Sequence, residues 1–446
     1  MRLLDCLRVG RGNGGGNGGG VKYLPEDLVI GILMRLPAEH LWRCRRVCKR
    51  WNALISSPDF AQAHLQQQSS SSSSSTSFVF HQFKKFVWPC VAQVKKVDFY
   101  SPPADGDSGS SKLVMNRVFN GSFVKRWKRQ MRGGLALPLA SCNGLILFRS
   151  CVCWEEYYIG NPITGELLTL TDPVWGRYRL CGFFYHSTTQ EYKMIHHHSS
   201  AAGHDGFRYV VSTLGTTEFE PTKRRRRLRT LPHCVRNGSP PVILDNALYW
   251  MIAEAGLPST CENSIMMFIM DSEEFSTLPH PPNSCPTRQV NERFTLHEMM
   301  NVLQMEGRLA CLCLSEKVGD LWFFVFSDSD NYSGYWSRIH TLNFYSNSII
   351  FPLDFPDHSL QFVSIIRNTE LLLVWHWKGA FRYNLLTNVM EKIELEGIEE
   401  SDYKLDLWLA GYTKSVVSLK NVYPCCDLYP KSKWNRFISK MISCFT

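Results

Sequence analysis

The region from Phe78 to about Leu419 fills most of the 446 residues and consists of short runs of alternating apolar and aromatic residues. Gly, Pro, Asn and Asp separate these runs, and none of them keeps a helical period. Alternation of this kind predicts strands, and turn residues at short intervals predict antiparallel pairing. This part of the sequence therefore predicts one large all-β domain.

A loose repeat of strand, polar turn and strand runs through the same region. Its units are YYIGNPITGELLTL from Tyr157, FFYHSTTQEYKMI from Phe183, IMMFIMDSEEFSTLP from Ile265, WFFVFSDSDNYSGYWSRIHTL from Trp322 and FRYNLLTNVMEKIEL from Phe381. The later units recur at roughly 55 to 60 residues, a spacing that suits a four-stranded propeller blade with its loops. We expect Asn161-Pro162 and Thr164-Gly165 at polar hairpin tips. A β-propeller is the preferred architecture, and another antiparallel sandwich or barrel is the alternative.

Apolar runs between these units are expected to be the inner strands, buried on both faces. They are SCNGLILF from Ser141, PVILDNALYWMI from Pro241, LACLCL from Leu309 and ELLLVWHW from Glu370.

The stretch from Val21 to Leu65 has a different period and predicts three short helices. In the first helix, apolar residues recur every four positions, and Pro25 suits its start. Pro37 ends this helix, because the residue before a proline is pushed out of the helical region. Leu41 lies on the second helix, and the third ends at Ser57-Pro58.

About 45 residues is close to the lower limit for a chain that folds unaided. The apolar residues of this stretch therefore either meet another protein in a groove or pack against the rest of the same chain. Their pattern alone favours neither alternative.

The segment LPEDLVIGILMRLPAEHLWRCRRVCKRWNALISSPDF resembles an F-box across nearly its whole length. Leu24-Pro25, Leu36-Pro37, Val47-Cys48-Lys49, Trp51 and the closing Ser57-Pro58-Asp59-Phe60 stand where that family has them. Gly31 and Trp42 depart from the family pattern. The resemblance implies that this segment binds a Skp-type adaptor, and through it a cullin ubiquitin ligase. The implied adaptor-binding residues are Leu24, Pro25, Leu28, Ile32, Leu33, Leu36, Pro37, Leu41, Val47, Cys48, Trp51, Leu54 and Ile55.

The order of the units after Phe78 is similar to that of the F-box-associated domains of plant F-box proteins, which look like kelch-type propellers. SCNGLILF, YYIGNPITGELLTL, PVILDNALYWMI, RLACLCL and AGYTKSVVSLK carry this resemblance. It implies a substrate-recognition subunit of a Skp–cullin–F-box ubiquitin ligase, in which the β domain binds an unknown protein substrate. The alternatives are a nuclear regulatory or interaction factor outside any ligase, a propeller enzyme and a sugar-binding module.

Composition divides the chain into five parts. Residues 1–20 are expected to be a disordered Gly-rich tail, residues 21–65 the F-box and residues 66–77 a flexible Gln/Ser linker. Residues 78–420 form the propeller-like domain, and residues 421–446 a basic amphipathic tail that packs on its own domain or binds a partner or membrane surface. A flexible linker predicts that the F-box and the β domain are only loosely coupled.

Sixteen cysteines follow no disulfide or zinc spacing and are expected to be thiols in a reducing compartment, cytoplasmic or nuclear. His196-His197-His198 is read as a loop without a metal. The run from Lys223 to Arg229 is either a nuclear signal or, preferably, a solvated hairpin loop. A net charge of +9 without a basic aromatic stripe argues against nucleic acid. Since no catalytic motif, cofactor motif, secretory signal or membrane-length apolar run occurs, we expect a non-catalytic adaptor without cofactors.

Overall fold

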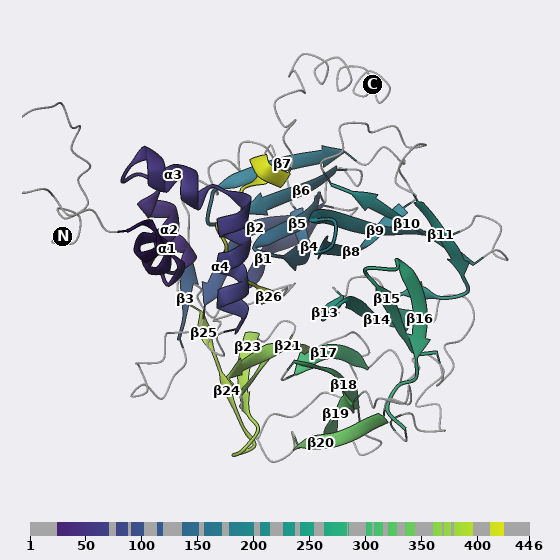
Figure 1. Ribbon diagram of the computed structural model, residues 1–446. Helices are drawn as coiled ribbons and strands as arrows, with labels where there is room; N and C mark the ends of the chain where they lie inside the picture. The colour runs from purple at the N-terminus through teal and green to yellow at the C-terminus, as the bar shows by residue number, and fades with distance from the viewer. Residues whose placement is uncertain are drawn as a thin grey trace, which may run out of the picture.

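The computed structural model describes the chain in segments, coloured in Figure 1. These are residues 25–70, 77–87, 91–101, 114–118, 136–150, 156–171, 178–199, 206–214, 226–236, 241–253, 263–282, 284, 300–305, 307–314, 320–327, 335–343, 360–367, 370–375, 379–395 and 411–422. The Gly-rich tail, most of the basic C-terminal tail, and the residues Leu24, Cys151, Cys153, Cys425 and Cys426 lie outside these segments.

Four helices form the N-terminal part, where the sequence predicted three. They are α1 (Glu26–Met34), α2 (Ala38–Cys44), α3 (Lys49–Ile55) and α4 (Pro58–Ser70). Ser57-Pro58 does end α3, but the Ser57 hydroxyl also accepts a hydrogen bond from the Phe60 N–H and so caps α4. A capping serine followed by proline at the first helical position is a helix start signal, which the prediction missed.

The predicted linker at residues 66–77 is wrong at both of its ends. Helix α4 continues to Ser70, and the first strand already begins at Ser77. The glutamines and serines of this run therefore extend a helix that starts in the F-box. Only residues 71–76 of the predicted linker lie outside the described segments.

Five consecutive antiparallel sheets confirm the predicted propeller (Figure 1). Blade 1 contains β4 (Ala136–Cys142), β5 (Leu145–Ser150), β6 (Glu156–Asn161) and β7 (Glu166–Thr171). Blade 2 contains β8 (Tyr178–His186), β9 (Glu191–Ser199), β10 (Phe207–Thr213) and β11 (Arg226–Leu231). Blade 3 contains β13 (Val242–Leu244), β14 (Ala247–Ala253), β15 (Ile265–Ile269) and β16 (Glu274–Leu278), with β12 (Cys234–Val235) added to β14. Blade 4 contains β17 (Asn301–Met305), β18 (Arg308–Leu314), β19 (Asp320–Ser327) and β20 (Tyr335–Asn343), and blade 5 contains β21 (Leu360–Arg367), β22 (Glu370–Trp375), β23 (Gly379–Asn384) and β24 (Val389–Lys392).

A sixth sheet joins the two ends of the β domain. It has the order β25-β3-β2-β1-β26, with β1 (Ser77–Val87), β2 (Val91–Ser101), β3 (Val114–Val118), β25 (Glu394–Leu395) and β26 (Gly411–Tyr412). Strand β26 pairs with β1 at only two positions, and helix α6 (Leu419–Val422) follows it. Strands from the start and the end of the domain therefore meet in one sheet, which closes the chain on itself.

The inner strands are buried as the apolar runs predicted. Leu145 to Phe148 on β5 are completely buried, and Leu309 to Cys313 on β18 are at most 4% exposed. Each of these strands has a hydrogen-bonded neighbour on both sides, so only its two faces remain for side-chain packing. The Cys311 and Cys313 sulfurs lie 3.5 Å apart as buried thiols, as predicted for cysteines that share one face of a strand.

The hairpin turns of blades 1 and 5 share one conformation. The Asn161 and Asn384 side chains each accept hydrogen bonds from the backbone N–H groups two and three residues further on. Gly165 and Asn388 close these turns with φ of 70° and 57°, in the left-handed region that Gly and Asn tolerate best. The sequence repeat is thus confirmed as a repeated turn geometry.

Two predicted loops are strands instead. His196 to His198 belong to β9, and Arg226 to Arg229 belong to β11 at the outer edge of blade 2. The histidines are stabilised there by aromatic neighbours on other strands, since His196 meets the edge of the Tyr157 ring and His197 packs against Tyr209. The polarity of the segment itself contains no information on these contacts with other strands, so it could not predict them.

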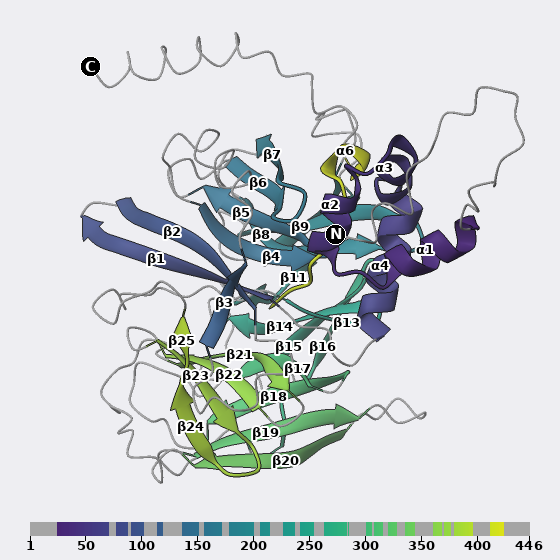
Figure 2. The same cartoon turned by 90° about the vertical axis from the view of Figure 1, so that its left-hand side faces the viewer.

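The predicted loose coupling of the F-box and the propeller is contradicted by the packing. One hydrophobic cluster contains Leu33, Leu41 and Ile55 of the F-box together with Leu145 and Tyr157 of blade 1. In Figure 1 the four helices lie against the propeller, and Figure 2 shows α6 beside both β7 and the F-box. The F-box and the propeller therefore form a common core.

Candidate functional site

Helix α1 presents the most exposed apolar surface of the F-box. Leu28 and Ile32 are 55% and 50% exposed, and their spacing of four residues places them on one face of the helix. Pro25 and Pro37, which flank α1, are exposed as well. Large apolar side chains in contact with water are a recurrent mark of a protein interface. We refer to Pro25, Leu28, Ile32 and Pro37 as the α1 face.

Other predicted adaptor-binding residues lie inside the molecule. Leu33, Leu41 and Ile55 are 0% exposed and belong to the core shared with the propeller. Their side chains hold the helices in place and do not reach a partner at the surface of this structure. Leu36, Val47, Cys48, Trp51 and Leu54 are half-buried.

Cys48 has a structural role that the F-box pattern did not reveal. Its sulfur accepts a hydrogen bond of 3.4 Å from the Trp51 N–H at the start of α3. The side chain therefore caps α3, in the way that serine or threonine caps most helices. Trp51 itself packs against the shared core.

His64 of α4 supports the end of α1. Its Nε2 donates a hydrogen bond of 2.8 Å to the Leu36 carbonyl, at the break before Pro37. The ring is completely buried, and burial lowers the pKa of His64, while the Leu36 carbonyl opposes this shift. A neutral histidine thus fixes the position of the helix that carries the α1 face.

Trp42, a departure from the F-box pattern, lies near the junction with the propeller. The Arg45 guanidinium stacks over its ring at 3.9 Å. Burial lowers the pKa of Arg45, and the charge of Glu166 in blade 1 opposes that shift. The carboxylate of Glu166 in blade 1 therefore interacts electrostatically with the Arg45 guanidinium of the F-box.

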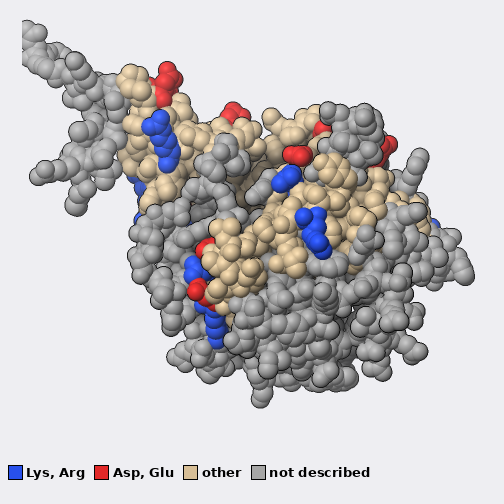
Figure 3. Space-filling view, turned by 90° about the horizontal axis from the view of Figure 1, so that it is seen from below, with Lys and Arg blue, Asp and Glu red and all other residues tan. Residues whose placement is uncertain are grey.

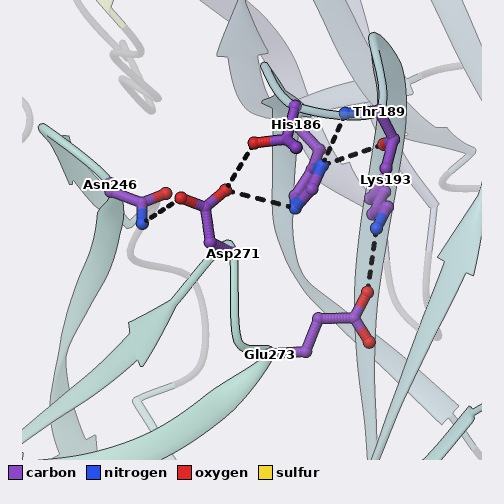
Figure 4. A network of polar contacts seen from close by, with 7 residues as sticks. His186, Thr189, Lys193, Asn246, Asp271 and Glu273 are labelled. Carbon is purple, nitrogen blue, oxygen red and sulfur yellow. Dashed lines mark hydrogen bonds and ion pairs between the residues drawn. The ribbon is translucent and has the colours of Figure 1, made fainter.

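A polar network connects blades 2 and 3 (Figure 4). Asp271, in the β15–β16 turn, accepts hydrogen bonds from Asn246 and Thr188 and lies 3.5 Å from the His186 ring. Lys193 reaches Glu273 of the same turn at 2.8 Å. Asp271 and Glu273 of blade 3 thus contact His186, Thr188 and Lys193 of blade 2, an arrangement that suits a structural joint better than a catalytic site.

A cavity of about 240 Å³ opens beside this joint. It is lined by Leu231, Pro232, His233, Asn263, Met266, Phe275, Ser276 and Thr277. Pockets for small-molecule ligands usually measure roughly 300 to 1,000 Å³. This cavity is smaller, and its volume suits one large side chain better than a cofactor.

Metal ligation has little support in the part of the chain that the structure describes. Within that part, no three His, Cys, Asp or Glu side chains converge on a position for an ion. His197 Nδ1 instead lies 3.6 Å from the Cys234 sulfur. No helix among the described segments has the length and hydropathy needed to cross a bilayer.

The described surface seen from below carries charges of both signs. Figure 3 shows Lys and Arg interspersed with Asp and Glu, without a continuous basic stripe over the described residues of that face. Binding to nucleic acid requires such a stripe, so this face offers no support for that alternative.

Four helices with an exposed apolar face, docked on a propeller, are the arrangement of an F-box protein with an associated β-propeller domain. Residues 21–64 match the F-box-like family, and residues 88–422 match the family described as the F-box associated beta propeller domain. The second match covers most of the chain, and the chain belongs to this family.

Relatives from Arabidopsis thaliana are similar at low identity. The F-box protein At5g65850 is 23% identical over 424 residues, 90% of this chain and 91% of its own length. The F-box protein At3g07870 is 23% identical over 324 residues, 68% of each chain. The F-box sequence At1g33530 is 27% identical over 264 residues, which span 58% of this chain and only 50% of that relative.

Similarity to solved structures is weaker. An oligogalacturonate lyase in complex with manganese aligns with a TM-score of 0.32 and 8% identity, over 56% of this chain and 62% of that chain. A similarity at this level supports no functional comparison.

Proposed function

We propose that this protein is the substrate-recognition subunit of a Skp–cullin–F-box ubiquitin ligase. The observation that carries the proposal is the α1 face, with Leu28 and Ile32 half exposed at the outer side of an F-box whose other large apolar side chains are buried or half-buried. A Skp-type adaptor would cover this face as a groove covers an amphipathic helix. The propeller would hold the protein substrate.

The protein would act without catalytic residues of its own. A receptor that holds a substrate beside the charged ubiquitin carrier raises the local concentration of the reacting groups, and this proximity supplies the rate gain. The interblade network is consistent with this role, because its ionised groups are paired with one another in a structural joint. The thiol state of Cys311 and Cys313 supports a reducing compartment, which we propose to be the cytoplasm or the nucleus.

The experiment is adaptor binding by the full chain with Leu28→Ala and Ile32→Ala combined. Truncating two central interface anchors costs about 2 kcal/mol or more, or a loss of affinity of at least about 30-fold. The matched control is Leu386→Ala with Val389→Ala, which removes two apolar side chains of blade 5 that are 73% and 44% exposed. Adaptor binding should survive in the control. Equal affinity in both double variants would contradict the proposal.

A further inference from the structure

Residues 411–422, which we call the closing strap, connect the end of the propeller to the F-box. The strap begins with β26, which pairs with β1, and ends with α6 beside β7 and the F-box (Figures 1 and 2). Tyr412, Ser415, Val416 and Leu419 are at most 2% exposed. A peripheral segment that only followed the surface would not be buried to this degree.

Blade 1 binds the strap through the turn that the sequence predicted as a polar hairpin tip. Asn161 is completely buried, and its amide donates hydrogen bonds of 3.1 and 2.8 Å to the Ser415 and Val417 carbonyls. The Ser415 hydroxyl donates in turn to the Asn143 carbonyl at 2.7 Å. The predicted hairpin turn is therefore present between β6 and β7, and a segment more than 250 residues away covers it.

Glu166, at the start of β7, holds the far end of the strap. Its carboxylate accepts hydrogen bonds of 2.9 Å from the Ser418 hydroxyl and 2.6 Å from the Leu419 N–H. It therefore caps the first turn of α6, where an N–H group would otherwise lack a partner.

The path of the strap depends on a glycine in blade 1. Gly144 has a φ of 77°, and an added Cβ would lie 2.1 Å from the Ser415 hydroxyl oxygen and 2.9 Å from the Thr413 carbonyl oxygen. A side chain at this position would displace the strap. Gly307 has nearly the same φ, 73°, with open space around it, and offers a matched control for the backbone strain alone.

The F-box is bound to the opposite side of the strap. Lys414 forms an ion pair of 2.6 Å with Glu39 of α2, and both side chains are partly buried. The Asn421 amide donates a hydrogen bond of 2.8 Å to the Ser56 carbonyl at the end of α3. Burial and, secondarily, the Glu39 charge raise the pKa of Tyr412, in agreement with a close approach of α2 to the strap.

From these contacts we infer that the closing strap orients the F-box relative to the propeller, and that it does so only when β26 has closed the ring. Asn161, Glu166 and Glu39 are then positioning residues. They fix the orientation of the α1 face relative to the propeller. An adaptor bound to the α1 face would therefore meet the propeller, and any substrate bound to it, at a defined angle. The consequence for ubiquitin transfer rests on the function proposed above, whereas the orienting contacts do not.

The test measures the distance between spin labels attached through unnatural amino acids at the exposed positions Asp27 and Arg308 of the full chain. The original chain should give one narrow distance distribution. Gly144→Ala should broaden it, whereas Gly307→Ala should leave it unchanged. Glu39→Lys and Lys414→Glu should each broaden it, and the combined charge swap should narrow it again.

A second readout is self-ubiquitination in the reconstituted complex with adaptor, cullin and ubiquitin carrier. Glu39→Lys should spread modification over more lysines and lower its rate several-fold at unchanged adaptor affinity, and the charge swap should restore both. Two results would contradict an orienting role of the closing strap. One is a broad distance distribution in the original chain, and the other is a distribution that does not change with Gly144→Ala or Glu39→Lys. Broadened distances with unchanged ubiquitination would overturn the positioning role. If distances respond as expected but the original chain transfers no ubiquitin, the ligase proposal fails and the strap stands.

Discussion

The Lys193 ammonium lies 2.8 Å from the Glu273 carboxylate, and this contact joins blade 2 to blade 3. The two side chains are only 8% and 11% exposed, and the Glu273 carboxylate compensates the buried charge of Lys193. Breaking a buried pair from one side typically costs about 3 to 5 kcal/mol, because the remaining charge is left without a partner.

We therefore expect Glu273→Met alone to lower the unfolding midpoint strongly, because the buried Lys193 charge loses its carboxylate partner. Lys193→Met combined with Glu273→Met should recover most of the loss, since the double change leaves no isolated buried charge. Urea unfolding monitored by tryptophan fluorescence measures both. If the double variant is as unstable as the single one, the pair does not act as a compensating unit.

Gly31 is a position where an added side chain should increase the stability of the F-box. It lies inside α1, and an added Cβ would meet nothing within 4 Å. Gly31→Ala should stabilise the F-box by about 1 kcal/mol, because alanine loses less backbone freedom in a helix. Hydrogen exchange of the α1 amides would show this as slower exchange. Faster exchange would mean that the glycine has another role in α1.

Burial of His64 should make the stability of the F-box depend on pH. Its pKa is lowered in the folded chain, so the unfolded chain binds the proton more readily. Stability should therefore fall as the pH decreases below about 6.5, the ordinary histidine value, towards the folded pKa. His64→Gln should flatten this slope in thermal unfolding curves recorded between about pH 7.5 and about pH 5, a range that contains the ordinary histidine value. The exposed His40 provides the control, since His40→Gln should preserve the slope.

Linker length should matter little, because contacts and not chain length place the F-box. Inserting about ten serines between Ser70 and Ser77 adds flexible chain at a loop-closure cost below about 1 kcal/mol. The label distance between α1 and blade 4 should stay narrow, and the ubiquitination rate should not change. A ubiquitination rate that falls with linker length would mean that the linker acts as a flexible tether and that the strap contacts do not place the F-box.

Local patterns predicted the elements well where neighbours in sequence decide the outcome. The helical period through Leu28 and Ile32, the break at Pro37 and the alternating strands required no distant information. The start of α4 was missed because Ser57-Pro58 both ends one helix and begins the next.

The candidate sites depended on contacts that no local pattern contains. Asn161 has the sequence of an exposed turn, and only its bonds to Ser415 and Val417 reveal that it is buried. The strap contains most of AGYTKSVVSLK, which carries the resemblance to F-box-associated domains, but nothing in that pattern indicates its contacts with the F-box. Of the implied adaptor residues, Leu28 and Leu33 look alike in sequence, and only packing against the propeller separates the exposed one from the buried one.

Closure of the ring by the strap also has a consequence for folding during synthesis. The F-box leaves the ribosome first, whereas the strap that holds it follows roughly 340 residues later. At about 5 to 20 residues per second, the F-box waits on the order of 20 to 70 seconds for its docking partner. During that interval the surface that will pack on blade 1 and the strap is exposed on every nascent chain. We therefore expect holding chaperones to bind the newly made F-box until blade 1 and the strap cover its apolar surface.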